Sequence, residues 1–153
     1  MSKGEVRRLP TIIMKTWFLR YMKLPASDRW LLVCAAFAII KARLTVTFVP
    51  LRQILKPLAL QTAALSPSVD AARIGWAVET VSRIVPTGKN CLVRAMAART
   101  ILARYGFRGE IRLGIRKNSS DVLNGHAWLE CGDQIITGES EHQSYMMMPL
   151  GEG

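Results

Sequence analysis

The residues best suited to chemistry in this chain are a cysteine and a histidine. Cys91 begins an apolar, helix-forming run that extends to about Tyr105, and His126 follows it by 35 residues in a strand-like run. A free cysteine thiol is mostly protonated at neutral pH, and both a helix N-terminus and a neighbouring imidazole favour the thiolate. We therefore predict nucleophilic catalysis in which Cys91 attacks and His126 is its base.

The other cysteines and the second histidine fit this chemistry less well. Cys34 and Cys131 lie in apolar segments, where a lone cysteine is usually a small core residue. His142 lies in a polar stretch near the C-terminus, whereas His126 is on a strand that can pack against the Cys91 helix. Three cysteines at spacings of 57 and 40 fit neither a disulfide framework nor paired zinc ligands. We therefore expect a reducing, cytoplasmic setting, and the predicted chemistry requires no metal or other cofactor.

A third group should orient the imidazole, and the sequence leaves its identity open. If Gly132 and Asp133 form a two-residue hairpin turn, opposite positions sum to 265 and Glu139 lies across from His126. Asp133 itself is about 23 Å from His126 along an extended strand, which is too far to reach it. We favour Glu139, but a bulge or a longer turn reopens the choice with Asp121, Glu141 or a backbone carbonyl.

The N-terminal part of the chain is predicted to be helical. Residues 29–40 are apolar on nearly every side of a helix, and Ser27 and Asp28 are candidate N-caps. Residues 42–50 alternate like a strand, but a helix that continues and ends before Pro50 fits about as well, and we favour the helix.

Two further helices precede the strands. Asp70 can cap a helix that ends before Pro86, and Gly106 is a candidate left-handed cap at the end of the Cys91 helix. The Cys91 amide is the first candidate donor for an oxyanion hole, and Asn90 is either a second donor or an N-cap. The hydrophobic period then changes to two, which predicts strands over residues 110–116, 126–131 and 134–138.

These elements predict an α+β fold, in which N-terminal helices precede a Cys-bearing central helix packed on a small antiparallel sheet. Residues 1–57 are read as an N-terminal helical extension and residues 58–153 as the catalytic domain, the two forming one compact unit. A chain of 153 residues can bury one ordinary core, so a large multidomain enzyme is excluded.

A net charge of +10 raises the question of an anionic partner. The basic residues are spread along the chain without a run of Lys/Arg or an aromatic platform, so we expect a solvated basic surface rather than a nucleic-acid site. The longest apolar run, Leu31 to Ile40, is ten residues, whereas a membrane span needs roughly 20. We expect no membrane span and no secretory signal, while a mildly acidic peptide partner stays open.

Four short motifs together resemble the leader peptidases of lasso peptide biosynthesis, which are small members of the transglutaminase-like cysteine protease superfamily. The motifs are Asn-Cys-Leu-Val-Arg-Ala-Met-Ala at 90–97, Arg-Tyr-Gly-Phe at 104–107, Leu-Gly-Ile-Arg at 113–116 and His-Ala-Trp-Leu-Glu at 126–130. The resemblance extends over roughly Asp70 to Leu150 and implies a transglutaminase- or papain-like core with Cys91 and His126 as catalytic residues. Many relatives carry an aspartate as the third catalytic residue, where this chain has Thr137-Gly138-Glu139.

The resemblance also implies a function and partners. A cysteine endopeptidase of this kind cuts the leader from a ribosomally made precursor peptide, so that a separate cyclase can close the freed core. A separate leader-recognition protein is the expected partner, with the lasso cyclase as a further candidate, and the apolar region 29–49 is a candidate docking surface. Two alternatives remain, a transglutaminase-like acyl transferase and a non-catalytic basic module that binds a peptide or a membrane.

Overall fold

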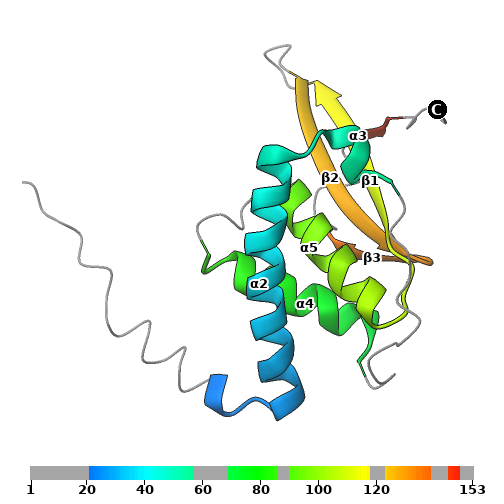
Figure 1. Cartoon of the computed structure of the whole chain (residues 1–153). Coiled ribbons are helices and arrows are strands. Elements are labelled where there is room, and N and C mark those ends of the chain that lie inside the picture. The colour runs from blue at the N-terminus through cyan, green and yellow to red at the C-terminus, as the bar shows by residue number, and fades with distance from the viewer. Residues whose placement is uncertain (1–20, 57–68, 86–89, 118–122, 139–144, 149–153) are drawn as a thin grey trace, which may run out of the picture.

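The computed structural model describes residues 21–56, 69–85, 90–117, 123–138 and 145–148, and it has the predicted α+β architecture (Figure 1). The helices are α2 (Ala26–Phe48), α3 (Leu51–Ile54), α4 (Ala71–Ser82) and α5 (Cys91–Arg104). The strands are β1 (Glu110–Lys117), β2 (Leu123–Cys131), β3 (Gln134–Thr137) and β4 (Met146–Met147). They form one antiparallel sheet in the order β3-β2-β1-β4. The predicted boundary between residues 57 and 58 lies outside the described residues.

Helix α2 is continuous to Phe48, which confirms helix rather than strand in its second half. The hydroxyls of Thr45 and Thr47 donate to carbonyls one turn back, so these β-branched residues are accommodated in the helix. Val49 is extended, as expected for a residue that precedes a proline.

The predicted caps of α2 are wrong. The helix begins at Ala26 with Pro25 at the N-cap position and no side-chain capping bond. Asp28 is instead buried and forms an ion pair with Arg73 of α4. A buried carboxylate needs a charged partner, and α4 supplies it 45 residues later in the chain.

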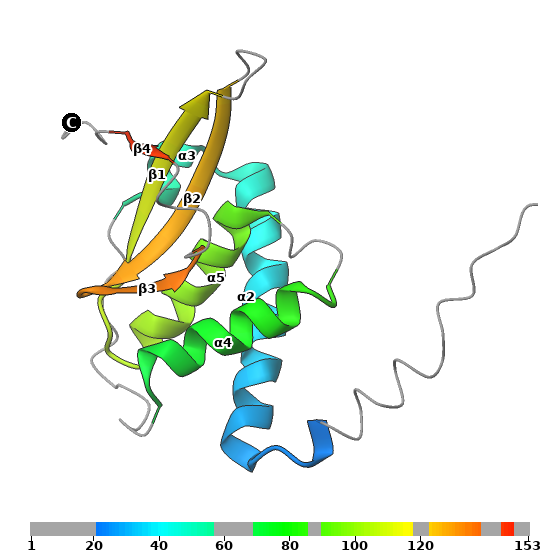
Figure 2. The same cartoon turned by 180° about the vertical axis from the view of Figure 1, so that it is seen from behind.

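The helices and the sheet pack in layers. Helix α2 packs on α4 and α5, and these two helices pack on β3 and β2. Figures 1 and 2 show α2 on the far side of α5 from the sheet. One hydrophobic core runs through all layers, and its most buried side chains include Leu31, Ile39, Ile74, Leu102 and Leu129.

Helix α2 has two apolar sides. Among the described residues it is the one helix long and apolar enough to cross a membrane, a test that the core helix of a globular protein also passes. Its inner side, which includes Leu31, Ala35 and Ile39, is buried in the core, whereas Phe37 on its outer side is 71% exposed. The outer side is therefore an apolar surface without cover among the described residues.

A glycine brings α4 unusually close to the sheet. A Cβ added to Gly75 would lie 2.4 Å from the carbonyl oxygen of Ile136 in β3. Ile136 is nearly fully buried at this contact and lies two residues before Gly138. Helix α4 is therefore packed closely on the strand that leads to Gly138.

Candidate active site

Cys91 is the first residue of α5 and is partly buried. Asn90 is the N-cap, because its side-chain oxygen accepts from the amides of Leu92 at 3.0 Å and Val93 at 3.4 Å. The Asn90 carbonyl accepts from the Arg94 amide at 3.1 Å and thereby begins the helical ladder. The thiol thus lies at a helix N-terminus, where the macrodipole favours negative charge.

The face of α5 below the thiol is made of small or aliphatic side chains. Ala95, Ala98 and Leu102 are fully buried, and α5 packs directly on β2. The helix ends at Arg104, and Gly106 has a φ of 81°, which confirms the predicted left-handed cap.

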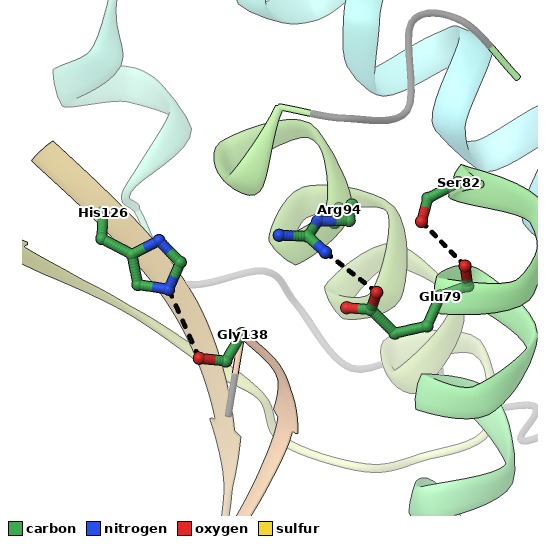
Figure 3. A network of polar contacts seen from close by, with 5 residues as sticks. All are labelled: Glu79, Ser82, Arg94, His126 and Gly138. Atoms are coloured by element: carbon green, nitrogen blue, oxygen red, sulfur yellow. Dashed lines mark hydrogen bonds and ion pairs between the residues drawn. The ribbon is translucent and has the colours of Figure 1, made fainter. Parts of the chain in front are cut away.

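His126 is buried in β2 and contacts a backbone carbonyl. Its Nε2 lies 3.3 Å from the carbonyl oxygen of Gly138, at the end of β3 (Figure 3). A carbonyl can only accept a hydrogen bond, so this contact requires a proton on Nε2. In the neutral ring Nδ1 is then the basic nitrogen.

The backbone at Gly138 fits this contact closely. Gly138 has a φ of 84°, and a Cβ added there would lie 3.1 Å from His126 Nε2 and 2.9 Å from Trp128 Cβ. Glycine is favoured on both counts, since a side chain is disfavoured at positive φ and has no room here.

The imidazole also stacks with two aromatic rings. The Tyr145 ring centroid is 5.0 Å from that of His126, and the Trp128 centroid is 6.1 Å away. The Arg116 guanidinium lies 4.9 Å from the Tyr145 centroid. Gly114 is opposite His126 in the β1–β2 register and leaves room for both rings, because a Cβ there would lie 2.7 Å from Tyr145 Cβ. The stacking restricts the orientation of the imidazole.

Beside the histidine, the same sheet face has a polar network. Trp128 donates its indole N–H to Glu130 at 2.8 Å, and Arg112 donates to the other carboxylate oxygen of Glu130 at 3.0 Å. These contacts place His126, Trp128 and Glu130 on one face of β2. Because Glu130 is held by Arg112 and Trp128, it fixes the indole that stacks on the imidazole.

The predicted hairpin turn is confirmed, but the register beyond it is not. Cys131 pairs with Gln134, so Gly132 and Asp133 form the turn. The register then shifts, and Leu129 pairs with Thr137 rather than with residue 136. The numbers of paired residues therefore no longer sum to 265 from Leu129 onward, so this rule does not give the residue opposite His126.

The bulge affects the choice of the third catalytic group. The register argument that placed Glu139 opposite His126 is wrong, and Glu139 itself lies outside the described residues, as do Asp121, Glu141 and His142. Asp133 is exposed in the turn. Of the alternatives, the described residues place a backbone carbonyl, that of Gly138, against the imidazole.

The two remaining cysteines are in apolar surroundings. Burial raises the pKa of Cys34, against an opposing effect of Arg104, and burial also raises the pKa of Cys131, with Asp70 adding to the effect. A raised pKa disfavours the thiolate at neutral pH, in agreement with a structural role for both residues. Among the described residues, no group of three His, Cys, Asp or Glu side chains could hold a metal ion.

Three residues near the predicted site were missed from the sequence. Arg94 forms an ion pair at 2.9 Å with Glu79 and so ties the first turn of α5 to α4 (Figure 3). Tyr145 stacks on His126, and it lies within the region, roughly Asp70 to Leu150, over which the sequence resemblance extends. The Gly138 carbonyl had a weaker signal, a glycine at the end of the predicted strand.

The structure thus packs the helix that begins with Cys91 against the strand that carries His126. The catalytic roles of Cys91, His126 and Glu139 stay predictions.

Comparison with protein families matches residues 33–149 to the transglutaminase-like superfamily. The match covers most of the chain and includes both Cys91 and His126, so the protein belongs to the transglutaminase-like superfamily. That superfamily includes cysteine peptidases and acyltransferases. Comparisons with curated proteins and with solved structures give no match.

Proposed function

We propose that the protein is a cysteine endopeptidase that removes the leader from a ribosomally made lasso peptide precursor. The observation that carries the proposal is the packing of α5, which begins at the capped residue Cys91, against β2, whose His126 has Nε2 directed at the Gly138 carbonyl. Membership of the transglutaminase-like superfamily supports the reaction class. The resemblance of the motifs at 90–97 and 126–130 to lasso leader peptidases supports the substrate.

In the proposed reaction, His126 Nδ1 takes the proton from the Cys91 thiol. The thiolate attacks the scissile carbonyl carbon, and the C–N bond then breaks as the imidazolium gives its proton to the departing amine. Water, deprotonated by the same imidazole, hydrolyses the thioester and regenerates the thiol. The Gly138 carbonyl orients the ring through Nε2–H, a position that an aspartate or asparagine side chain occupies in other cysteine and histidine pairs.

The backbone amide of Cys91 is the proposed oxyanion donor. Asn90 Oδ1 accepts from the amides of Leu92 and Val93, and the Asn90 carbonyl accepts from that of Arg94. The cap thereby leaves the Cys91 amide for an anion that forms beside the thiol. This arrangement assigns the Asn90 side-chain oxygen to capping.

The partners follow from the proposed substrate. The precursor peptide is the substrate, a separate leader-recognition protein presents it, and the lasso cyclase accepts the freed core. The proposed reaction needs no cofactor, and the proposed location is the cytoplasm.

The proposal is tested with the full chain, a synthetic lasso precursor and its leader-recognition protein, with products weighed by mass spectrometry. Cys91→Ala should abolish cleavage and leave the unfolding midpoint unchanged, since alanine suits a helix and the residue is only partly buried. Retained cleavage by this variant would exclude the mechanism. Added glycine ester distinguishes acyl transfer, because hydrolysis adds water to the acyl fragment and transfer adds the amine.

A further inference from the structure

We propose that the outer face of α2 binds an acidic amphipathic helix of a partner protein. The face is defined by six exposed apolar residues, here called the α2 stripe: Trp30, Val33, Phe37, Ile40, Leu44 and Phe48. The proposal does not depend on the peptidase chemistry, because α2 lies on the far side of α5 from the sheet that carries His126 (Figures 1 and 2).

The spacing of the α2 stripe is that of a helix–helix seam. Successive members are three or four residues apart, which is the a/d pattern that pairs one helix with another along a narrow line. The two most exposed members, Phe37 and Phe48, are 71% and 79% exposed. Large aromatic side chains are seldom left in water on this scale unless they meet a partner.

A groove beside the stripe provides holes for the side chains of a partner helix. It has a volume of about 350 Å³ and lies between α2 and α5, with Cys34 and Ala38 contributed by α2 and Ile101 by α5. Trp30 and Phe37 of the stripe form one of its walls. A ridge of side chains fits such a groove, whereas a flat surface does not.

The charges around the stripe define the chemistry of the partner. On the groove side of the stripe, Lys41 and Arg104 line the groove. On the opposite side of the stripe lie Arg29 and Arg43, as the helical rotation of 100° per residue places them. The one acidic residue of α2, Asp28, is buried and paired with Arg73, so it does not offset these charges. Carboxylates along both edges of a partner helix would pair with the basic rims.

Other occupants suit the surface less well. Residues 1–20 of this chain carry five Lys/Arg and one Glu, so they would meet the basic rims with like charge. A second copy would bring together two chains of net charge +10. A lipid surface favours a wider apolar face than one seam and would leave the groove unfilled.

The test uses a fluorescent three-heptad peptide with Leu at a and d and Glu at e and g, added to the full chain and followed by anisotropy. The peptide should bind, and should protect Cys34 in the groove from iodoacetamide without protecting Cys131. Phe37→Asp and Lys41→Glu should each weaken binding about tenfold or more. Leu123→Asp, at an apolar residue of β2 that is 60% exposed, is the control and should bind normally.

Four results would overturn the proposal: no binding, equal binding by the Phe37→Asp and Leu123→Asp variants, equal binding of a peptide with Lys at e and g, or binding that appears only after residues 1–20 are deleted. Phe37-dependent binding to phosphatidylcholine–phosphatidylserine vesicles in place of the peptide would assign the face to a membrane. Phe37-dependent self-association in sedimentation would assign it to a second copy. The Cys91→Ala variant should bind the peptide as the parent does, so failure of the peptidase proposal and failure of this one are distinguishable.

Discussion

The contact between His126 and the Gly138 carbonyl leads to a quantitative prediction for Gly138→Ala. The new Cβ would lie 3.1 Å from His126 Nε2 and 2.9 Å from Trp128 Cβ, at a residue whose φ is 84°. A non-glycine residue in this conformation costs about 1–2 kcal/mol, and overpacking adds about 1–3 kcal/mol. We expect a total loss of about 2–5 kcal/mol in the free energy of unfolding.

Gly132→Ala is the matched control for this variant. Gly132 also has a positive φ, of 59°, but a Cβ there meets nothing within 4 Å. It should lose only the conformational part, about 1–2 kcal/mol, so the difference between the variants isolates the contact with the histidine. Urea unfolding, read at constant m-value, measures both.

A functional measurement accompanies the stability measurement. Displacement of the imidazole in Gly138→Ala should slow the alkylation of Cys91 near neutral pH, while Gly132→Ala should leave it unchanged. If Gly138→Ala destabilises the fold no more than Gly132→Ala and alkylates at the parent rate, the Gly138 carbonyl does not orient His126.

Three further predictions concern the elements that support the site. Asn90→Ala removes the cap of α5 and should lower the free energy of unfolding by about 1 kcal/mol in urea; no change would mean that the cap contributes nothing. A glycine-to-alanine change normally stabilises a helix, but in Gly75→Ala the new Cβ would lie 2.4 Å from the Ile136 carbonyl oxygen. We therefore expect the free energy of unfolding to fall by about 1–3 kcal/mol. A higher melting temperature would contradict the close packing of α4 on β3. Burial raises the pKa of Cys34 and Cys131, so their stabilising contribution is present below the unfolded pKa and is lost as pH rises through the folded pKa. The free energy of unfolding should therefore fall in the alkaline range, and it should fall less in the variant with alanine at both positions. Urea unfolding measured at a series of pH values tests this.

Local signals in the sequence predicted most of the fold. Asp70 and Asn90 are N-caps, Gly106 ends α5, and Gly132 forms the hairpin turn with Asp133. Each of these features depends on residues a few positions apart, so periodicity and capping chemistry were enough to find them.

The features that the sequence did not predict depend on tertiary contacts. Asp28 had the residue type of a cap, but its partner Arg73 is 45 positions away. The bulge in the β2–β3 pair lies where Ile136 meets Gly75 of α4, and no local pattern in the strand indicates that contact. The bulge changes the register of the β2–β3 pair, so the pairing that placed Glu139 opposite His126 does not hold.

The central claim is that Cys91 is a thiolate activated by His126, and site-resolved iodoacetamide labelling between about pH 5 and pH 9 tests it most directly. The full chain and its His126→Ala variant are labelled, and each cysteine is followed by mass spectrometry. We expect Cys91 to react at the acid end of this range and to lose that reactivity in His126→Ala, while Cys34 and Cys131 react only as the pH rises. Labelling of Cys91 that follows the other two cysteines, or that is the same in both proteins, would contradict the claim.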